Sequence, residues 1–332
     1  ERFAAGAAAA ARAPAFQAPG REWVDKVLDV ARDALENHPP GAGHWDVRRQ
    51  ALMLLDFPLH VRASANWRGE VGRFYQRFLS RAIDEIARDR VTEGVRVWKL
   101  YNMGFVVKSP SYCVAFDVHP GWVLRDGLSR EQMRRLADSL DVAFVSHFHP
   151  DHLSRRFLRC MLRAGKKVVL PANAWLWRDD PNIVRVNGRS GGGLRIDGLA
   201  VAAHRGWQRM LAHNYVYVVE MDGLRICHTG DNTNLRVYRA LADGPPLDLA
   251  MVNAWAGFHS FVQRVGPRMV LTGHENELAH IPALRAPYEF AIRQLERLGL
   301  PPSPDRQEPN GGSCAVLSWG ESIQLAAANP VT

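Results

Sequence analysis

The sequence predicts a layered α/β fold that is preceded by helices, and three observations support this prediction. Residues 21–90 repeat apolar side chains at helical spacing, residues after 92 alternate short apolar runs with helical stretches, and a His-rich segment directly follows one apolar run. The 332 residues, 47% of them hydrophobic, are enough to bury a large core. We therefore expect an Ala/Pro-rich segment at 1–20, a helical subdomain at 21–92 and the main domain at 93–332.

The helices of the N-terminal subdomain are predicted from apolar residues three and four positions apart. A first helix begins at Arg21 and stops at Pro39-Pro40-Gly41, a second covers Val47–Leu55 and ends before Pro58, and a third covers Glu70–Arg90. We interpret their many aromatic side chains as core rather than as a binding surface.

The main domain begins with β-rich runs and continues as an alternation of strands and helices. The expected strands are Val95–Leu100, Gly104–Lys108, Tyr112–Val118, Asp141–Val145, Lys167–Leu170, Leu199–Ala203, Tyr215–Glu220, Leu224–Cys227, Leu249–Val252 and Met269–Leu271. The expected helices are Arg130–Leu140, Leu153–Arg163, Asn234–Ala242 and Ala286–Leu298.

The charge of the chain favours an anionic partner. The formal net charge is +8, which suits phosphorylated metabolites, phospholipid head groups or nucleic acid. An equal alternative is that dispersed arginines only solvate the surface. Because no run of basic residues is interleaved with aromatic ones, nucleic acid is the less favoured partner.

Cysteines and the N-terminal segment bear on cellular location. The four cysteines are far apart and predict neither a disulfide framework nor thiolate metal ligands. No apolar run reaches the roughly 20 residues that cross a bilayer. The Ala-rich start resembles the end of an export signal, so a periplasmic or secreted location is slightly favoured over a cytoplasmic one, with a linker as the alternative.

The segment Ser146-His-Phe-His-Pro-Asp-His-Leu153 is the strongest functional signal. In extended backbone His147 and His149 point the same way and can converge on one ion, whereas Asp151 and His152, after the turn that Pro150 promotes, can face a second. Imidazole and carboxylate ligands suit zinc, manganese or iron. Three histidines and an aspartate within six residues are hard to explain by packing alone.

The pattern H-x-H-x-D-H resembles the signature of the metallo-β-lactamase superfamily over about residues 95–320. This resemblance implies an αββα sandwich with two divalent metal ions, most often zinc. It implies that His147, His149 and His204 hold one ion, that Asp151, His152 and His274 hold the other, and that Asp231 bridges them. His204 and His274 are expected to end strands, and His213 competes with His204 but begins a strand.

The order of these motifs looks like the branch that contains ascorbate-phosphate lactonase and N-acyl phosphatidylethanolamine phospholipase D. Asp117, at a strand end, would orient a ligand histidine, with a turn cap as the alternative. Asp151 and His280 are the candidate catalytic residues, the latter as the acid for the leaving group. The residues expected to line the substrate pocket, with packing as the alternative for each, are Trp207, Gln208, Asn214, Trp255 and His259.

These observations predict a dinuclear metal-dependent hydrolase. A bridging hydroxide would attack a phosphodiester or lactone of an anionic small molecule or lipid. Two alternatives stay open: a nuclease of the same fold, which would bind nucleic acid in a strongly salt-dependent way, and a metal-bearing scaffold whose N-terminal helices bind a protein or membrane. Native substrate, metal identity and oligomeric state do not follow from the sequence.

Overall fold

The computed structural model describes residues 21–60, 68–121, 127–173, 180–187, 192–208, 212–275, 287–300 and 312–326. Three helices come first, with a short 3-10 turn, η2 (Ala42–His44), before the second of them. They are α1 (Arg21–Asn37), α2 (Trp45–His60) and α3 (Arg68–Arg88). None of the helices among these residues is both long and apolar enough to cross a membrane.

Two seven-stranded sheets form the centre of the molecule. The first has the order β14-β1-β2-β3-β4-β5-β6 and the second the order β13-β12-β11-β10-β9-β8-β7. The strands of the first sheet are β1 (Val95–Lys99), β2 (Phe105–Lys108), β3 (Cys113–Phe116), β4 (Val142–Phe144), β5 (Lys167–Pro171), β6 (Ile183–Val186) and β14 (Ser322–Leu325). Those of the second are β7 (Gly192–Ile196), β8 (Leu199–Gln208), β9 (Ala212–Met221), β10 (Leu224–His228), β11 (Leu249–Asn253), β12 (Met269–Gly273) and β13 (Ser313–Ala315).

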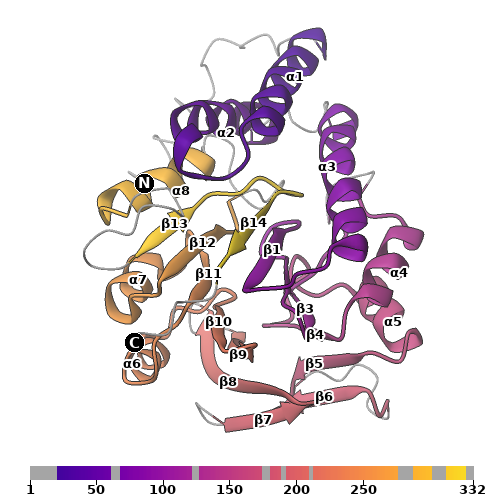
Figure 1. The fold of residues 1–332 in the computed structure, drawn as a ribbon, viewed down its shortest axis with the longest axis vertical. Helices are drawn as coiled ribbons and strands as arrows, with labels where there is room; N and C mark the ends of the chain where they lie inside the picture. Colours follow the sequence, from indigo (N-terminus) through magenta and orange to yellow (C-terminus); the bar gives the residue numbers. More distant parts are fainter. Residues whose placement is uncertain are drawn as a thin grey trace, which may run out of the picture.

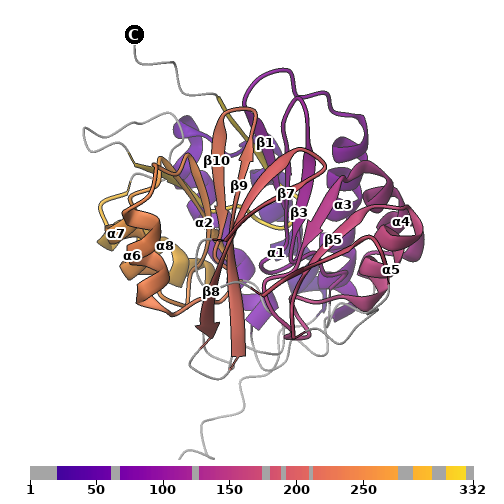
Figure 2. The same cartoon turned by 90° about the horizontal axis from the view of Figure 1, so that it is seen from below.

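Helices cover the outer face of each sheet. Figure 1 shows α3, α4 (Arg130–Ser139) and α5 (Arg155–Arg163) beside the first sheet, and α6 (Leu235–Ala242), α7 (Phe258–Val265) and α8 (Pro287–Arg297) beside the second. The view from below shows the two helical layers on opposite sides of the strands (Figure 2). This arrangement is an αββα sandwich, so the predicted fold class, with its N-terminal helices, is confirmed.

Strand periodicity explains why the chain forms two cores. On β1, Val97 faces the space between the sheets while its neighbour Trp98 faces the helices, as the two-residue repeat of a strand requires. The inter-sheet core contains Phe105, Phe116 and Tyr217. The central strands of each sheet are buried on both faces, which suits their almost continuous apolar runs, whereas the edge strand β7 is largely exposed.

The N-terminal helices share the outer core with the main domain. Leu52 of α2 and Phe78 of α3 belong to the same cluster of buried residues as Trp98 and Trp319. A buried ion pair between Arg48 and Glu321, 2.8 Å from Nη2 to Oε2, joins α2 to the segment before β14. The packing of residues 21–60 therefore depends on the segment before β14, which lies far away in the sequence.

Several boundaries differ from the predicted ones. The helix expected to end before Pro58 continues to His60, because a proline so close to the C-terminus removes only one hydrogen bond of the helix. The strands β6, β7, β13 and β14 and the helix α7 were not expected. β8 is longer than expected and ends at Gln208 rather than Ala203, so the prediction that His204 ends a strand is wrong.

Parallel pairing brings the ends of distant strands to one edge. β3 pairs in parallel with β4, and β11 pairs in parallel with both β10 and β12. The carboxyl ends of these strands lead into Asp117, His147, Asp231 and His274. Pairing within each sheet thus groups Asp117 with the His-rich segment and Asp231 with His274, and the stacking of the two sheets brings these groups together.

Candidate metal centre

Four side chains converge at the carboxyl edge of the two sheets. The Nε2 atom of His152 lies 3.1 Å from Oδ2 of Asp151, 3.4 Å from Oδ1 of Asp231 and 3.3 Å from Nε2 of His274. Nε2 of His274 is 3.2 Å from Oδ2 of Asp151 and 3.5 Å from Oδ1 of Asp231. We call Asp151, His152 and His274, together with this oxygen of Asp231, the second donor group.

A second set of donors lies on the other side of Asp231. His147, His149 and Asp231 each offer an atom within 4.8 Å of the others, and Nε2 of His147 is 3.7 Å from Oδ2 of Asp231. The rings of His147 and His149 are in contact, with centroids 4.5 Å apart. We call this set the first donor group. The two oxygens of Asp231 therefore face different groups.

Asp117 fixes the orientation of two histidines. Its carboxylate accepts hydrogen bonds from the backbone N–H of Ser146, 2.7 Å away, from the Ser146 hydroxyl, and from Nδ1 of His152, 2.7 Å away. Because the Ser146 hydroxyl donates to Asp117, it accepts from Nδ1 of His147 at 2.9 Å. Both histidines thus donate from Nδ1 and turn Nε2 toward the donor groups.

Amide side chains hold the two carboxylates. Asn102 Nδ2 donates to Oδ2 of Asp151 at 2.9 Å. Asn253 Nδ2 donates to Oδ1 of Asp231 at 2.6 Å, and Gln208 Nε2 donates to Oδ2 of the same residue at 2.8 Å. These bonds leave both carboxylates with lone pairs that point into the centre.

Uncommon backbone conformations accompany this geometry. Asn102, Asp117 and His274 have positive φ angles of 58°, 44° and 66°, which is rare for residues other than glycine and costs of order 1–3 kcal/mol each. Gly230 has a φ of 51°, and a Cβ there would lie 2.6 Å from Cβ of Ser146. The Gly-Asp pair of the sequence is thus required by close packing against the His-rich segment.

The charges of the site shift several pKa values. Burial lowers the pKa of His147 to about 3, and the neighbouring His152 acts in the same direction. Burial opposes ionisation of Asp231, yet the charges of His152 and His274 hold its pKa well below the ordinary value. Burial likewise opposes the charge of His152, but Asp151, Asp231 and Asp117 raise its pKa well above the ordinary value. The centre is therefore strongly cation-attracting.

The donor set fits metal ions. Nε2 of His147 and Oδ1 of Asp151 are buried and have no hydrogen-bond partner within the described residues. In the second donor group, the Nε2 atoms of His152 and His274 both face oxygens of Asp151 and Asp231. Buried polar atoms in this state are costly unless they are paired, and nitrogen and oxygen donors of this kind suit zinc or a similar divalent cation.

His204 lies outside both donor groups. Val201 and Ala203 face the inter-sheet core, and Ala202 packs against the helical side, so strand alternation turns His204 toward the helical side as well. Because β8 runs on to Gln208, the end of this strand brings Gln208 rather than His204 to Asp231. The ring of the competing His213, in β9, lies against Trp207 with centroids 4.5 Å apart and the ring planes tilted by 34°.

The expected pocket residues have different surroundings. Asn214 is fully buried and lines no open surface, because its amide donates to the carbonyl of Thr229 and accepts from the N–H of Asp231. The indole of Trp255 donates to the carbonyl of His274 at 2.8 Å, and its ring stacks on Phe290. His259 contacts Gln294 of α8. His280 lies outside the described residues.

Sequence reasoning missed four buried residues of the centre. Asn102 and Asn253 hold the carboxylates, and His228 stacks on Phe116 with ring planes 12° apart and lies 3.0 Å from the carbonyl of Met103. His119, two residues after Asp117, is buried beside Tyr101. A single asparagine or histidine forms no recognisable sequence motif, although His228 directly precedes the Thr-Gly-Asp segment.

Comparisons with known proteins agree with this geometry. A model of the β-lactamase superfamily domain matches residues 122–274, which contain the His-rich segment, Asp231 and His274. A UPF0173 metal-dependent hydrolase from Thermococcus onnurineus (strain NA1) is 26% identical over 166 residues, which are 45% of this chain and 72% of that protein.

Two solved structures show the same fold. Igni18, a metallo hydrolase from Ignicoccus hospitalis KIN4/I, matches 70% of this chain and 99% of its own with 17% identity and a TM-score of 0.53. An isothiocyanate hydrolase from Delia radicum gut bacteria matches 70% of this chain and all of its own, with 13% identity and a TM-score of 0.52. The fold is therefore that of metallo-β-lactamase-fold proteins, and the chain is similar in sequence to a metal-dependent hydrolase.

Proposed function

We propose that this protein hydrolyses an ester-type bond, a phosphodiester or a lactone, of an anionic small molecule or lipid with the help of two divalent cations, zinc in the first place. The observation that carries the proposal is the position of Asp231. Its Oδ2 faces His147 of the first donor group, and its Oδ1 faces His152 and His274 of the second. A carboxylate placed between two sets of imidazoles is suited to hold a cation on each side.

Two cations held in this way supply the Lewis acidity that ionises water near neutral pH. The protein's own part is to keep the donors fixed and ready. Asp117 holds the Nδ1 protons of His152 directly and of His147 through Ser146, while Asn102, Asn253 and Gln208 hold the carboxylates. These contacts reduce the rearrangement that binding of metal and substrate would otherwise need.

The substrate class rests on charge and on the finer likeness to one branch of the superfamily. The net charge of +8 favours an anionic substrate. The order of His-rich segment, Gly-Asp pair and Gly-His pair supports a reaction of the kind catalysed by the ascorbate-phosphate lactonase and phospholipase D branch.

Metal analysis coupled to an activity screen tests the proposal. Purified protein would be stripped with a chelator, reloaded with zinc, manganese or iron, and assayed on bis-p-nitrophenyl phosphate, simple lactones and phospholipid vesicles. We expect about two ions per chain and turnover of at least one ester. Asp231→Asn should lose metal and turnover, while the matched control Asp243→Asn, at an exposed helix end, should keep both.

The outcomes are separable. Reloaded protein that holds no metal, or that holds metal and hydrolyses none of the three substrate classes, contradicts the proposal. Binding of nucleic acid that weakens steeply with salt, together with its cleavage, would support the nuclease instead.

A further inference from the structure

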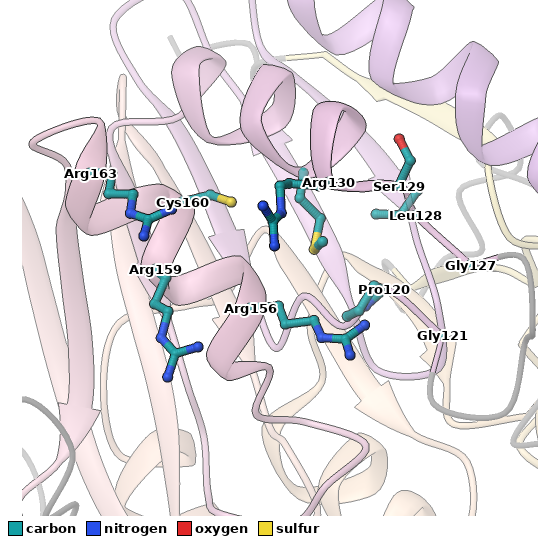
Figure 3. Close-up of a pocket in the computed structure, with 11 residues that line it drawn as sticks. Pro120, Gly121, Gly127, Leu128, Ser129, Arg130, Arg156, Arg159, Cys160 and Arg163 are labelled. Atoms are coloured by element: carbon teal, nitrogen blue, oxygen red, sulfur yellow. The ribbon is translucent and has the colours of Figure 1, made fainter.

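A basic pocket lies between α4, α5 and the segment that follows β3. Its volume is about 460 Å³, within the range of sites that take small organic ligands. The lining includes Arg130 from the first turn of α4 and three arginines of α5, which are Arg156, Arg159 and Arg163. Figure 3 shows the three arginines following one another along α5, with Arg130 reaching from the neighbouring helix toward the same space.

Helical periodicity places the arginines of α5 on one face. Arg156, Arg159 and Arg163 are spaced by three and four residues, so their side chains follow a single stripe. The opposite face buries Phe157, Leu158 and Met161 in the outer core. α5 is thereby held by its apolar side while its basic stripe borders the pocket.

The positive charge of the pocket is not neutralised by the part of the chain that the structure describes. None of its four arginines forms an ion pair there, and none of the lining residues is acidic. In contrast, Arg48 is paired with Glu321, and Arg96 with Asp89. Burial raises the pKa of Cys160, the lining residue between Arg159 and Arg163, so its thiol adds no negative charge.

The pocket adjoins the candidate metal centre. α5 begins three residues after His152, and the lining residues Pro120 and Gly121 directly follow His119. The N–H of Gly121 donates to Nδ1 of His119 at 3.1 Å. Asp151 of the second donor group and Arg156 of the pocket are both near enough for their charges to act on the pKa of His119.

We propose that this pocket binds the anionic group, a phosphate or a comparable dianion, of the substrate whose ester bond the metal centre hydrolyses. The inference rests on the proposed function and narrows the substrate to molecules that carry a negative group apart from the bond that is broken. Guanidinium groups bind phosphate oxygens through paired hydrogen bonds, and four of them around one cavity favour a multiply charged group.

Binding to metal-free protein tests the pocket independently of catalysis. Chelator-treated and dialysed protein would be titrated with inorganic pyrophosphate in a calorimeter, since without metal the donor groups repel an anion. We expect one saturable site. Arg156→Gln with Arg159→Gln should weaken binding by about tenfold or more, because each lost charged hydrogen bond contributes on that scale. The matched control Arg155→Gln, on the same helix outside the pocket, should leave it unchanged.

A kinetic comparison tests the link to the substrate. The metal-loaded double variant would be assayed on 6-phosphogluconolactone and on gluconolactone, which differ by a remote phosphate. KM should rise about tenfold or more for the phosphorylated lactone only, with little change in kcat. Equal binding of pyrophosphate by wild type and double variant, or an unchanged KM, overturns the inference. If wild-type protein hydrolyses neither lactone nor any other ester, the proposed function fails, whereas the titration still decides whether the pocket binds anions.

Discussion

The two donor groups differ in how completely the chain builds them. In the second group Asp151, His152 and His274 are all buried, and their nitrogen and oxygen atoms lie 3.1–3.5 Å from one another or from Asp231. In the first group His149 is only half-buried, Nε2 of His147 lies 3.7 Å from Oδ2 of Asp231, and no third histidine of the described residues joins the group. The comparison indicates that the folded protein preorganises the second group without metal. The first group would be completed by the ion that it binds.

The largest expected effect comes from removing a histidine of the preorganised group. His152→Asn should lower kcat/KM by about a thousandfold or more, because it removes a donor that faces both carboxylates. His149→Asn, in the less complete group, should lower it by only about ten- to a hundredfold. Steady-state kinetics and metal content of both variants, with the exposed His44→Asn as control, check this. A larger loss for His149→Asn would reverse the ranking of the two groups.

Asp117 should matter to both groups because it orients His152 directly and His147 through Ser146. Asp117→Asn places an amide donor where Ser146 and His152 already donate, and metal affinity should fall by about 10–100-fold. Competition with a chromophoric chelator would measure the affinity. Unchanged affinity, with the Asp243→Asn control also unchanged, would show that the histidines need no such support.

Acid should destabilise the metal-free protein through His119, which lies beside the second donor group. Burial lowers the pKa of His119 to about 4, against an ordinary value near 6.5 in the unfolded chain. As the pH falls from 6.5 toward 4, the unfolded state takes up a proton that the folded state does not, so stability falls by up to about 1.4 kcal/mol per pH unit for this residue.

His119→Asn, which keeps an acceptor for the N–H of Gly121, should make the dependence less steep. Urea unfolding of metal-free protein at several pH values between 4 and 7 measures it. Equal slopes in wild type and variant would mean that His119 is not kept neutral by the fold.

The smallest expected effect concerns the missing third donor of the first group. Because β8 passes His204 and brings Gln208 to Asp231, His204→Asn should leave metal content and turnover unchanged. Loss of one ion per chain in this variant would show instead that His204 reaches the first group when metal is present, as the resemblance to the superfamily implies.

The sequence was informative wherever a short segment carried the pattern. The layered α/β fold followed from alternating elements, and the resemblance carried by the H-x-H-x-D-H segment implied the αββα sandwich and pointed to Asp231 and His274, which do lie beside that segment. The length of β8 was not predictable, because the β propensity of its residues does not show which residue of a ten-residue strand lies at the edge that carries the metal centre.

Long-range hydrogen bonds were also hidden from sequence reasoning. Asn102 meets Asp151 across 49 positions, and Asn253 meets Asp231 only because β10 and β11 are parallel neighbours. The arginines of α5 showed a different failure. From the sequence, dispersed surface charge was one of two explanations of the many arginines. The pocket could not be foreseen, because it forms only when α4 packs against α5.

The pairing of β1 with β14, reinforced by Arg48 and Glu321, has a consequence for how the protein is made. During synthesis β1 cannot pair with β14 until residues 322–325 have been made, and Arg48 of α2 cannot form its ion pair before Glu321 has been added. A chain that stops before residue 312 should therefore expose the N-terminal helices to proteases, and equal protease resistance of shortened and full chains would contradict this. Synthesis of the segment that contains Val316 and Trp319 is thus needed to complete the outer core.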